Sequence, residues 1–283
     1  MTTVAQLPKL PPRAPDSHKG DFGRVLLIGG SRDMPGSISL SGMAALRSGA
    51  GLVTIATPDV CQPIVAGFEP SYMTAAVASD KDGRIAIAAI ERVCQLVAHA
   101  TVVAIGPGLG QSSDVTELVT TLYREVPLPM VVDADGLNAL AARRDVLPTH
   151  AGPRVLTPHP GEFARLTASD GPPPDRIATA KELAAQASVV VVLKGHGTVI
   201  TDGSRHAVNS TGNPGMATGG TGDVLTGVVS ALMAQQLAPF DAARLGVHVH
   251  GLAGDLAAAE LGQVSLTASD LIRFLPNVFR QMT

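Results

Sequence analysis

The stretch "RVLLIGG" (24–30) is a short, almost wholly apolar run that ends in two glycines. A strand with one wet face alternates polar and apolar residues, whereas a strand covered on both faces of a parallel sheet is apolar nearly throughout. Further runs of this kind lie at 52–57, 101–106, 130–135, 154–157 and 189–195. Their repetition predicts an α/β fold around a mostly parallel central sheet.

Helical patterns separate these runs. We expect helices at 37–49, 84–99, 113–124, 160–167 and 175–187, which have the length of crossover connections between parallel strands. The regular alternation of strand and helix predicts a layered domain with helices on both faces of the sheet.

The pattern changes after Lys194. "KGHG" (194–197) predicts a tight turn between antiparallel strands, with 205–209 as a candidate third strand. Helices are expected at 220–236, 241–261 and 268–280, the last with Thr267 as its N-cap. We expect one domain spanning 1–283, with 1–16 poorly ordered.

Composition excludes several function classes. The 283 residues carry a net charge of −3 at pH 7, contain no Trp and are only 3% aromatic, so neither a basic surface nor stacking platforms for nucleic acid are indicated. Cys61 and Cys94 lie far apart without metal-site spacing, which is typical of a reduced, cytosolic protein. The sequence shows no signal-peptide pattern and no apolar run of membrane-spanning length. We therefore expect a soluble, cytoplasmic protein without nucleic-acid or membrane partners.

The stretch "NPGMATGGTGDVLTG" (213–227) concentrates glycines around Asp223. Glycine loses more backbone entropy on folding than any other residue, so ordering such a run is costly. Apolar residues follow at helical spacing (Val224, Leu225, Val228, Val229 and Leu232), so the glycines open a helix. Bare amides at a helix start bind anions, and the helix dipole favours a carboxylate in the first turn. The pattern favours a catalytic base, Asp223, beside a phosphate held by the amides of Gly220, Thr221 and Gly222.

Two other segments place glycines or carboxylates at strand ends. "GPGLG" (106–110) is not a dinucleotide fingerprint, because Gln111 stands where the last glycine belongs; it is either a tight turn or a site of close approach to a ligand. In "VVDADGLNAL" (131–140), an N-cap role accounts for Asp135. Asp133 is either structural or a carboxylate that helps to hold hydrated Mg²⁺ near phosphates.

Histidines and a lysine complete the candidate residues. "LTPHPGE" (156–162) frames His159 between two prolines, and this rigidity suits a positioned ligand-binding residue as well as a simple turn. "KGHGT" (194–198) is either a hairpin turn or a segment whose Lys194 faces phosphates, with Thr198 near a ribose or base. His248 and His250 lie in an apolar helical pattern and are interpreted as satisfied core histidines.

Together these segments resemble one family. "SHKGDFGRVLLIGG", "SGMAALRSGAGLV", "AIGPGLG", "VVDADGLNAL", "LTPHPGE", "VVLKGHGTVI" and "GNPGMATGGTGDVLTG" occur in the order of the motifs of the NAD(P)H-hydrate dehydratases, from residue 17 to about 260. The glycine loop alone is shared across ribokinase-like kinases, whereas the ordered set is specific. The resemblance implies a ribokinase-like three-layer αβα sandwich.

The resemblance also implies an activity in metabolite repair. The S form of hydrated NADH or NADPH (NADHX or NADPHX) would be dehydrated to NADH or NADPH, while ADP becomes AMP and phosphate, or ATP becomes ADP and phosphate. Mg²⁺ would assist. A homotetramer is expected, as is a separately encoded NAD(P)HX epimerase, because the chain has no room for the epimerase domain of the fused family members.

Site residues follow from the resemblance by matching position. Ala45, Gly108 and His159 would contact the hydrate, and Asp223 would meet its hydroxyl and act as the catalytic base. The nucleotide would be bound by Lys194, Gly195, His196, Gly197, Thr198 and Gly222. No metal ligand is assigned beyond Asp133 acting through water.

Two alternatives remain open on the residues alone. A small-molecule kinase of the same fold, acting on a vitamin precursor or sugar, would share the glycine loop and Asp223, although "LTPHPGE" and "GPGLG" would then lack a reason. A non-catalytic nucleotide sensor would gain little from a carboxylate beside phosphates.

Overall fold

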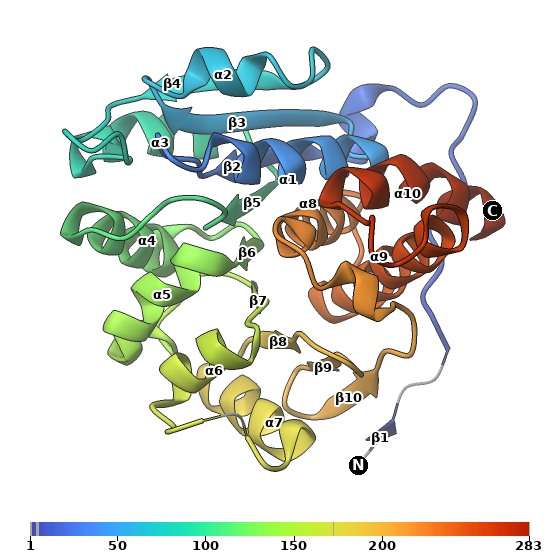
Figure 1. Cartoon of the computed structure of the whole chain (residues 1–283). Helices are drawn as coiled ribbons and strands as arrows, with labels where there is room; N and C mark the ends of the chain where they lie inside the picture. The colour runs from blue at the N-terminus through green and yellow to red at the C-terminus, as the bar shows by residue number, and fades with distance from the viewer. Residues whose placement is uncertain (1, 4–5, 172, 283) are drawn as a thin grey trace.

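The computed structural model describes residues 2–3, 6–171 and 173–282. Within these residues ten strands form one sheet, in the spatial order β1-β10-β9-β8-β7-β6-β5-β2-β3-β4. The strands are β1 (Thr2–Thr3), β2 (Arg24–Ile28), β3 (Leu52–Pro58), β4 (Met73–Val77), β5 (Val102–Ile105), β6 (Met130–Val132), β7 (Arg154–Leu156), β8 (Val190–Leu193), β9 (Val199–Thr201) and β10 (Arg205–Val208). Figure 1 shows the sheet running through the molecule from β4 to β10.

The pairing confirms a mostly parallel sheet. Neighbours from β4 to β8 are all parallel, whereas β9 pairs antiparallel with both β8 and β10. The predicted turn at "KGHG" therefore joins antiparallel strands, and the candidate strand at 205–209 is present as β10. The strands β1 and β4 at the two edges were not predicted.

Helices cover both faces. They are α1 (Pro35–Arg47), α2 (Gln62–Ala66), α3 (Ile90–Val97), α4 (Ser113–Glu125), α5 (Ala134–Ala142), α6 (Pro160–Thr167), α7 (Arg176–Ala187), α8 (Thr221–Ala234), α9 (Pro239–Leu261) and α10 (Ala268–Met282). Short 3₁₀ turns lie at Lys19–Phe22, Ile87–Ala89, Arg144–Val146 and Pro214–Met216. In Figure 1, α1 and α8–α10 lie on one side of the sheet and α4–α7 on the other.

Strand β2 shows why its sequence is apolar after Arg24. Val25 and Leu27 pack into the core beneath α1 and α8–α10, whereas Leu26 and Ile28 pack into the core beneath α3–α7. Because successive side chains of a strand point to opposite faces, a sheet covered twice requires both sets to be apolar. This confirms the layered α/β architecture.

Two predicted boundaries were wrong. The strand expected at 130–135 ends at Val132, because Asp133 takes the N-cap position of α5 and Ala134 begins that helix. The helix expected at 84–99 is regular only over Ile90–Val97. Before that helix, Ile85 forms an isolated antiparallel bridge with Ser79, and Ile87–Ala89 is a 3₁₀ turn.

Close approach of two helices places the start of α8. The α8 residue Gly227 faces the carbonyl of Ser41 in α1, and a Cβ there would lie 2.1 Å from that oxygen. The Ser41 hydroxyl in turn donates a 2.7 Å hydrogen bond to the Asp223 carbonyl. The first turn of α8 is thereby fixed beside the carboxyl ends of the central strands.

The N-terminal segment contacts the body of the protein. Arg13 donates a 2.8 Å hydrogen bond to the Gly49 carbonyl and lies over the ring of Phe22, and the Gln6 carbonyl accepts a 2.8 Å bond from Arg244. Residues 1, 4 and 5, on which part of the expectation for 1–16 falls, lie outside the described residues. Across the described ranges, no helix combines the length and the apolar character needed to cross a bilayer.

Candidate active site

A lysine and a carboxylate from two strand ends form the centre of the site. Asp133 follows β6 and Lys194 follows β8, and Lys194 Nζ lies 2.7 Å from Asp133 Oδ1. The other carboxylate oxygen of Asp133 accepts a 2.8 Å hydrogen bond from the Thr226 hydroxyl in α8. The Asp133 side chain is 1% exposed and that of Lys194 19%. This pair therefore joins two strands and a helix in a nearly dry environment.

Glycine at position 222 lets α8 approach this pair. A Cβ on Gly222 would lie 3.3 Å from Lys194 Nζ and 3.8 Å from Asp133 Oδ2. The preceding residue but one, Gly220, is the N-cap of α8 with φ +87°, a conformation that side-chain-bearing residues rarely adopt. The glycine loop thus brings the helix start, with its unpaired amides and positive dipole end, directly over the Lys194 ammonium.

The surroundings of Asp223 bring the pKa of its carboxyl group close to neutral pH. Burial, and next the nearby Asp133 carboxylate, raise the pKa of Asp223 to about 7, although a Ser37 hydrogen bond and the Lys194 charge lower it. Burial alone would lower the pKa of Lys194, but the Asp133 and Glu162 carboxylates outweigh it and raise that pKa. Lys194 therefore stays charged, while Asp223 can accept or release a proton near pH 7.

His159 begins α6 next to these groups. Its Nδ1 accepts from the backbone N–H of Gly161 (3.0 Å) and of Glu162 (3.3 Å), and Glu162 Oε2 accepts from the His159 N–H at 2.7 Å. Burial and the charges of Lys194 and Arg165 lower the pKa of His159, so the ring is neutral with its proton on Nε2. The side chain is 50% exposed and its Nε2 lies 3.4 Å from Glu162 Oε1, so the residue is a helix cap whose ring is still partly open to a ligand.

The predicted nucleotide residues line one cavity. It has a volume of about 880 Å³, and its walls include all six of them: Lys194, Gly195, His196, Gly197, Thr198 and Gly222. The apolar side chains Val208, Met216, Leu225 and Val247 form further parts of the wall. A cavity of this size with a charged end and apolar walls suits a nucleotide, with its phosphates toward Lys194 and the start of α8.

Arg176 and His250 hold this cavity in shape, and sequence reasoning missed both roles. Arg176 donates to the carbonyls of Leu193, Lys194, His196 and Gly197, so it fixes the backbone of the "KGHGT" segment. His250, interpreted as a core histidine, lies in the cavity wall and contacts the Thr221 carbonyl at 2.8 Å. A helix-start arginine after "PPD" carries no sequence signal for such contacts.

The structure brings Gly108 close to the site but not Ala45. Gly108 has φ +68°, and a Cβ there would lie 2.6 Å from the Met34 carbonyl and 3.0 Å from the Ser37 Cβ, next to the residue that hydrogen-bonds Asp223. "GPGLG" is therefore a segment of close backbone approach. Ala45 has no exposed surface and packs within the core beneath α1.

The interpretation of Asp135 as an N-cap was wrong. Asp133 occupies the N-cap position of α5, without a side-chain capping bond, because its carboxylate is used by Lys194 and Thr226. Asp135 lies in the first turn, where its carboxylate accepts from the Gly110 N–H at 2.9 Å and from Asn138 Nδ2 at 3.1 Å. It ties "GPGLG" to α5.

The donor set suits Mg²⁺ held mainly by phosphate oxygens and water. In the parts of the chain that are described, no three His, Cys, Asp or Glu side chains gather as a metal cage. Both oxygens of Asp133 already accept direct hydrogen bonds. Mg²⁺ keeps several of its waters and commonly binds through one or two carboxylates plus substrate phosphates, so this site fits that ion with Asp133 acting through water.

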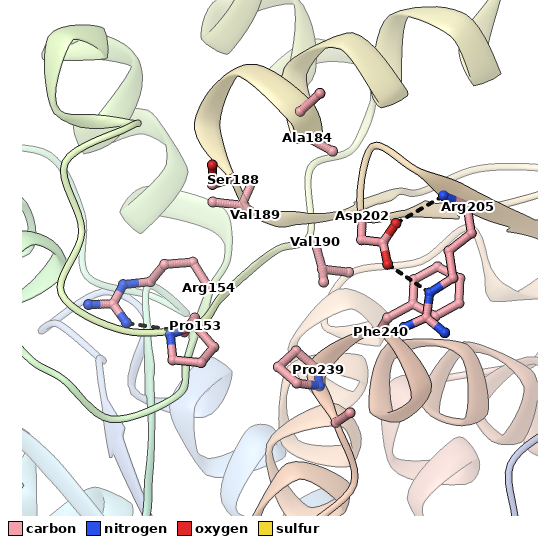
Figure 2. A pocket seen from close by; sticks show the side chains of 12 residues that line it. Pro153, Arg154, Ala184, Ser188, Val189, Val190, Asp202, Arg205, Pro239 and Phe240 are labelled. Carbon is pink, nitrogen blue, oxygen red and sulfur yellow. Dashed lines mark hydrogen bonds and ion pairs between the residues drawn. The ribbon is translucent and has the colours of Figure 1, made fainter.

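A second cavity lies at the other end of the strands from the candidate site. It has a volume of about 410 Å³ at the amino ends of β7 and β8, between Arg154, Asp202 and Phe240 (Figure 2). Its charged residues already have partners. The side chains of Asp202 and Arg205 pair at 2.7 Å. Arg154 donates hydrogen bonds to the carbonyls of Tyr123, Val126, Leu128 and Pro153. None of the predicted site residues lines it.

Solved structures share this fold over nearly the whole chain. The ADP/ATP-dependent NAD(P)H-hydrate dehydratase from Bacillus subtilis, co-crystallised with ATP and Mg²⁺, is 35% identical, with a TM-score of 0.83 over 97% of this chain and 95% of that chain. A ribokinase-like superfamily protein from Enterococcus faecalis is 28% identical, with a TM-score of 0.82 over 97% of this chain and 92% of that chain. The fold is therefore ribokinase-like.

Sequence comparison gives the family. The bifunctional NAD(P)H-hydrate repair enzyme Nnr of Moorella thermoacetica is 46% identical over 278 residues, which cover 97% of this chain and 52% of the relative. The chain thus spans about half the length of the curated relatives it matches. The family model for NAD(P)H-hydrate dehydratase matches residues 25–277. The chain belongs to the NAD(P)H-hydrate dehydratase family.

Proposed function

We propose that this protein dehydrates the S form of NADHX or NADPHX to NADH or NADPH, at the expense of ADP or ATP. The observation that carries the proposal is the position of Asp223. It is a partly buried carboxylate with a pKa of about 7, at the start of α8, beside the Lys194 end of the cavity. A base poised near neutral pH beside an anion site is what activation of a substrate hydroxyl toward a phosphate requires.

The first chemical step is phosphoryl transfer. The hydroxyl oxygen on the reduced nicotinamide ring attacks the terminal phosphorus of ADP or ATP, and the hydroxyl proton passes to the Asp223 carboxylate. The bond between that phosphorus and its bridging oxygen breaks, so AMP or ADP leaves. Lys194 and the amides of Gly220, Thr221 and Gly222 stabilise the charge on the transferred group, because positioned donors in a dry site need no reorganisation during the reaction.

Elimination completes the dehydration. The ring nitrogen adjoins the carbon that carries the phosphate, so its lone pair expels phosphate together with the electrons of the carbon–oxygen bond. The neighbouring ring carbon then loses a proton to the departing phosphate, which restores the double bond of NADH or NADPH. This step needs a good leaving group more than a second base, in agreement with a site built around a single half-titrated carboxylate, Asp223.

The two substrates occupy opposite sides of Asp223 in this proposal. The nucleotide fills the cavity lined by Gly195, His196, Gly197 and Thr198. The hydrate lies toward His159 and Gly108, whose segments lie at the ends of β7 and β5. Asp133 would help to hold Mg²⁺ through water, and the ion, when bound, would supply further charge neutralisation. The matched position Ala45 is fully buried, so it acts through the packing of α1 against α8.

Product stoichiometry tests the proposal. Under single-turnover conditions with NADHX, Mg²⁺ and ADP or ATP, the absorbance of NADH and the release of inorganic phosphate should rise together in equal amounts. A lasting phosphorylated product with a phosphate deficit would indicate a small-molecule kinase instead. Phosphate release without NADH would indicate that the protein hydrolyses the nucleotide without dehydrating NADHX. Nucleotide binding without turnover would indicate a non-catalytic nucleotide sensor.

Three further properties belong to the proposal. An epimerase activity supplies the S form, in keeping with the bifunctional relatives. The protein is cytoplasmic, where the exposed thiol of Cys94 stays reduced.

It is a homotetramer in which a second copy covers the apolar side chains exposed around α2 and β4 (Ile64, Phe68 and Met73). Sedimentation equilibrium of wild type and of Phe68→Glu tests the last point, since a monomeric wild type would contradict it.

A further inference from the structure

A chain of hydrogen bonds runs from "GPGLG" to an exposed arginine. The Gly110 N–H donates to Asp135 Oδ2 at 2.9 Å, and Asn138 Nδ2 donates to Asp135 Oδ1 at 3.1 Å. Arg165 Nε then donates to Asn138 Oδ1 at 2.9 Å. The first turn of α5 thereby connects the segment that contains Gly108 with the α6 helix that begins at His159.

This chain orients Arg165 without neutralising it. Its anchor, Asn138, is an uncharged amide, and the negative charge of Asp135 is directed at Gly110 and Asn138. Among the contacts of the described residues, the hydrogen bond of Arg165 uses Nε, which leaves both terminal nitrogens of the guanidinium for another partner. Arg165 is exposed to solvent. A fixed, exposed guanidinium whose two terminal nitrogens remain open is suited to bidentate binding of an anion.

Arg165 lies beside the residue assigned to the hydrate. A Cβ built on Gly161 would lie 3.0 Å from Cε1 of His159 and 3.8 Å from a terminal nitrogen of Arg165, so the two side chains flank the same glycine. Burial, then the charges of Lys194 and Arg165, lower the pKa of His159, so the Arg165 charge acts on that ring. The guanidinium is therefore close enough to act on whatever His159 binds.

Two neighbouring cations already pair with carboxylates. Lys194 pairs with Asp133 at the nucleotide side of the site, and Arg84, which reaches the Gln111 carbonyl after "GPGLG", pairs with Asp80 and Asp82. The dinucleotide substrate carries two negative charges on its pyrophosphate. That group needs a cation on the hydrate side of Asp223, and Arg165 is placed to supply it.

We propose that Arg165, oriented by Asn138 and Asp135, binds the pyrophosphate of the hydrated dinucleotide. The proposal rests on the dehydratase function proposed above and assigns to it a substrate-binding residue. It explains why an arginine on α6 is held by an amide on α5, since a carboxylate in place of Asn138 would cancel the charge that the substrate needs. Arg165 takes no part in the chemistry of the ring.

The test compares a full and a truncated substrate. In Arg165→Gln, the KM for NADHX should rise roughly tenfold to a hundredfold, the range for losing a charged hydrogen-bonding partner, with kcat and the KM for ADP little changed. Hydrated reduced nicotinamide riboside has no pyrophosphate, so its kcat/KM should be the same in both proteins. Arg165→Lys should restore part of the affinity for NADHX, because it returns the charge without the planar fork.

Two further variants separate binding from structure. Arg143→Gln removes another exposed arginine from just beyond the other end of α5 and should leave both substrates unaffected. Asn138→Ala keeps the guanidinium but frees it, so the KM for NADHX should rise less than in Arg165→Gln. An equal loss with NADHX and with the riboside in Arg165→Gln would show a structural role and overturn the proposal, as would unchanged kinetics. A wild-type protein inactive on NADHX would instead refute the dehydratase function itself.

Discussion

His250 contacts the backbone carbonyl of Thr221 at 2.8 Å, one residue before Gly222. A carbonyl can only accept, so the proton lies on His250 Nε2. Burial lowers the pKa of His250 to about 4, so the ring is a neutral donor at physiological pH. The peptide that carries this carbonyl also carries the N–H of Gly222, one of the amides proposed to bind phosphate. A hydrogen bond to its carbonyl holds that peptide in place and polarises its N–H group.

His250→Phe should therefore weaken nucleotide binding. It removes the donor while keeping a ring of similar size, and we expect the dissociation constant for ADP to rise by roughly threefold to tenfold, the range for a single neutral hydrogen bond. Calorimetric titration with ADP measures this. His248→Phe is the matched control on the same helix, since His248 contributes its backbone carbonyl to Thr211. Equal affinities in the two variants would contradict the role of His250.

Two glycines of α8 should respond differently to alanine. In Gly222→Ala the new Cβ would lie 3.3 Å from a Lys194 ammonium that Asp133 holds at 2.7 Å, so the loss should appear in ADP affinity and kcat, with the melting temperature nearly unchanged. In Gly227→Ala the Cβ would meet the Ser41 carbonyl at 2.1 Å, so α1 and α8 must separate and stability should fall. Thermal unfolding and ADP titration of both variants check this contrast, and a Gly222→Ala protein that binds ADP normally would refute it.

Turnover should rise with pH through about 7. Asp223 must be deprotonated to accept the hydroxyl proton, and burial and Asp133 raise its pKa to about 7. Asp223→Asn should lower kcat by about 10²–10⁴-fold, the usual loss of a general base, and should remove this limb of the profile. The measurement is kcat from pH 5.5 to 8.5 with NADHX. A variant that keeps most of its kcat would remove Asp223 from the mechanism.

The same carboxylate should destabilise the fold at high pH. Its folded pKa of about 7 lies above the ordinary aspartate value of 3.8, so between these values the folded protein binds more protons than the unfolded chain. Stability from this group is thus greatest below about pH 4 and falls as the pH rises to about 7. At pH 8, Asp223→Asn should be more stable than wild type by up to about 4 kcal/mol. Urea unfolding at pH 5 and 8 tests this, and a variant less stable than wild type at pH 8 would contradict it.

The strands found from the sequence are those with a strong physical signal. β2, β5 and β8 are covered on both faces and are therefore apolar throughout, which the sequence displays directly. β4 lies at the sheet edge, is only partly buried and consists largely of small residues, so it lacks both an alternating and a continuous apolar pattern. Edge strands of this kind are recognised through their pairing with β3, which the sequence does not show.

Some contacts of the site could likewise be predicted from the sequence, and others could not. The meeting of Lys194, Asp133 and the α8 start follows from a general rule, because the carboxyl ends of parallel strands converge at one edge of a sheet. Arg176 was not predictable, since its partners are backbone carbonyls about twenty residues away and any residue carries those. The family motifs identify the segments and their order along the chain, but the burial of each residue in the folded structure decides which groups it contacts.

His159 combines two roles that one substitution can separate. Its Nδ1 accepts from the N–H groups of Gly161 and Glu162, so it caps α6, while its half-exposed ring, whose Nε2 lies 3.4 Å from Glu162 Oε1, can contact a ligand. His159→Asn keeps a side chain that caps helices well and removes the imidazole donor, whereas His159→Ala removes both. We therefore expect both variants to raise the KM for NADHX more than that for ADP.

Only the alanine variant should also lose stability, by about 1 kcal/mol, the usual loss for a removed N-cap. Initial-rate kinetics with each substrate varied, together with urea unfolding of both variants, provide the measurements. Asn is the informative substitution, because any change in KM without a change in stability is then due to the lost Nε2–H donor. Equal increases in the KM for NADHX and for ADP in His159→Asn would mean that the two substrates do not occupy separate sides of Asp223.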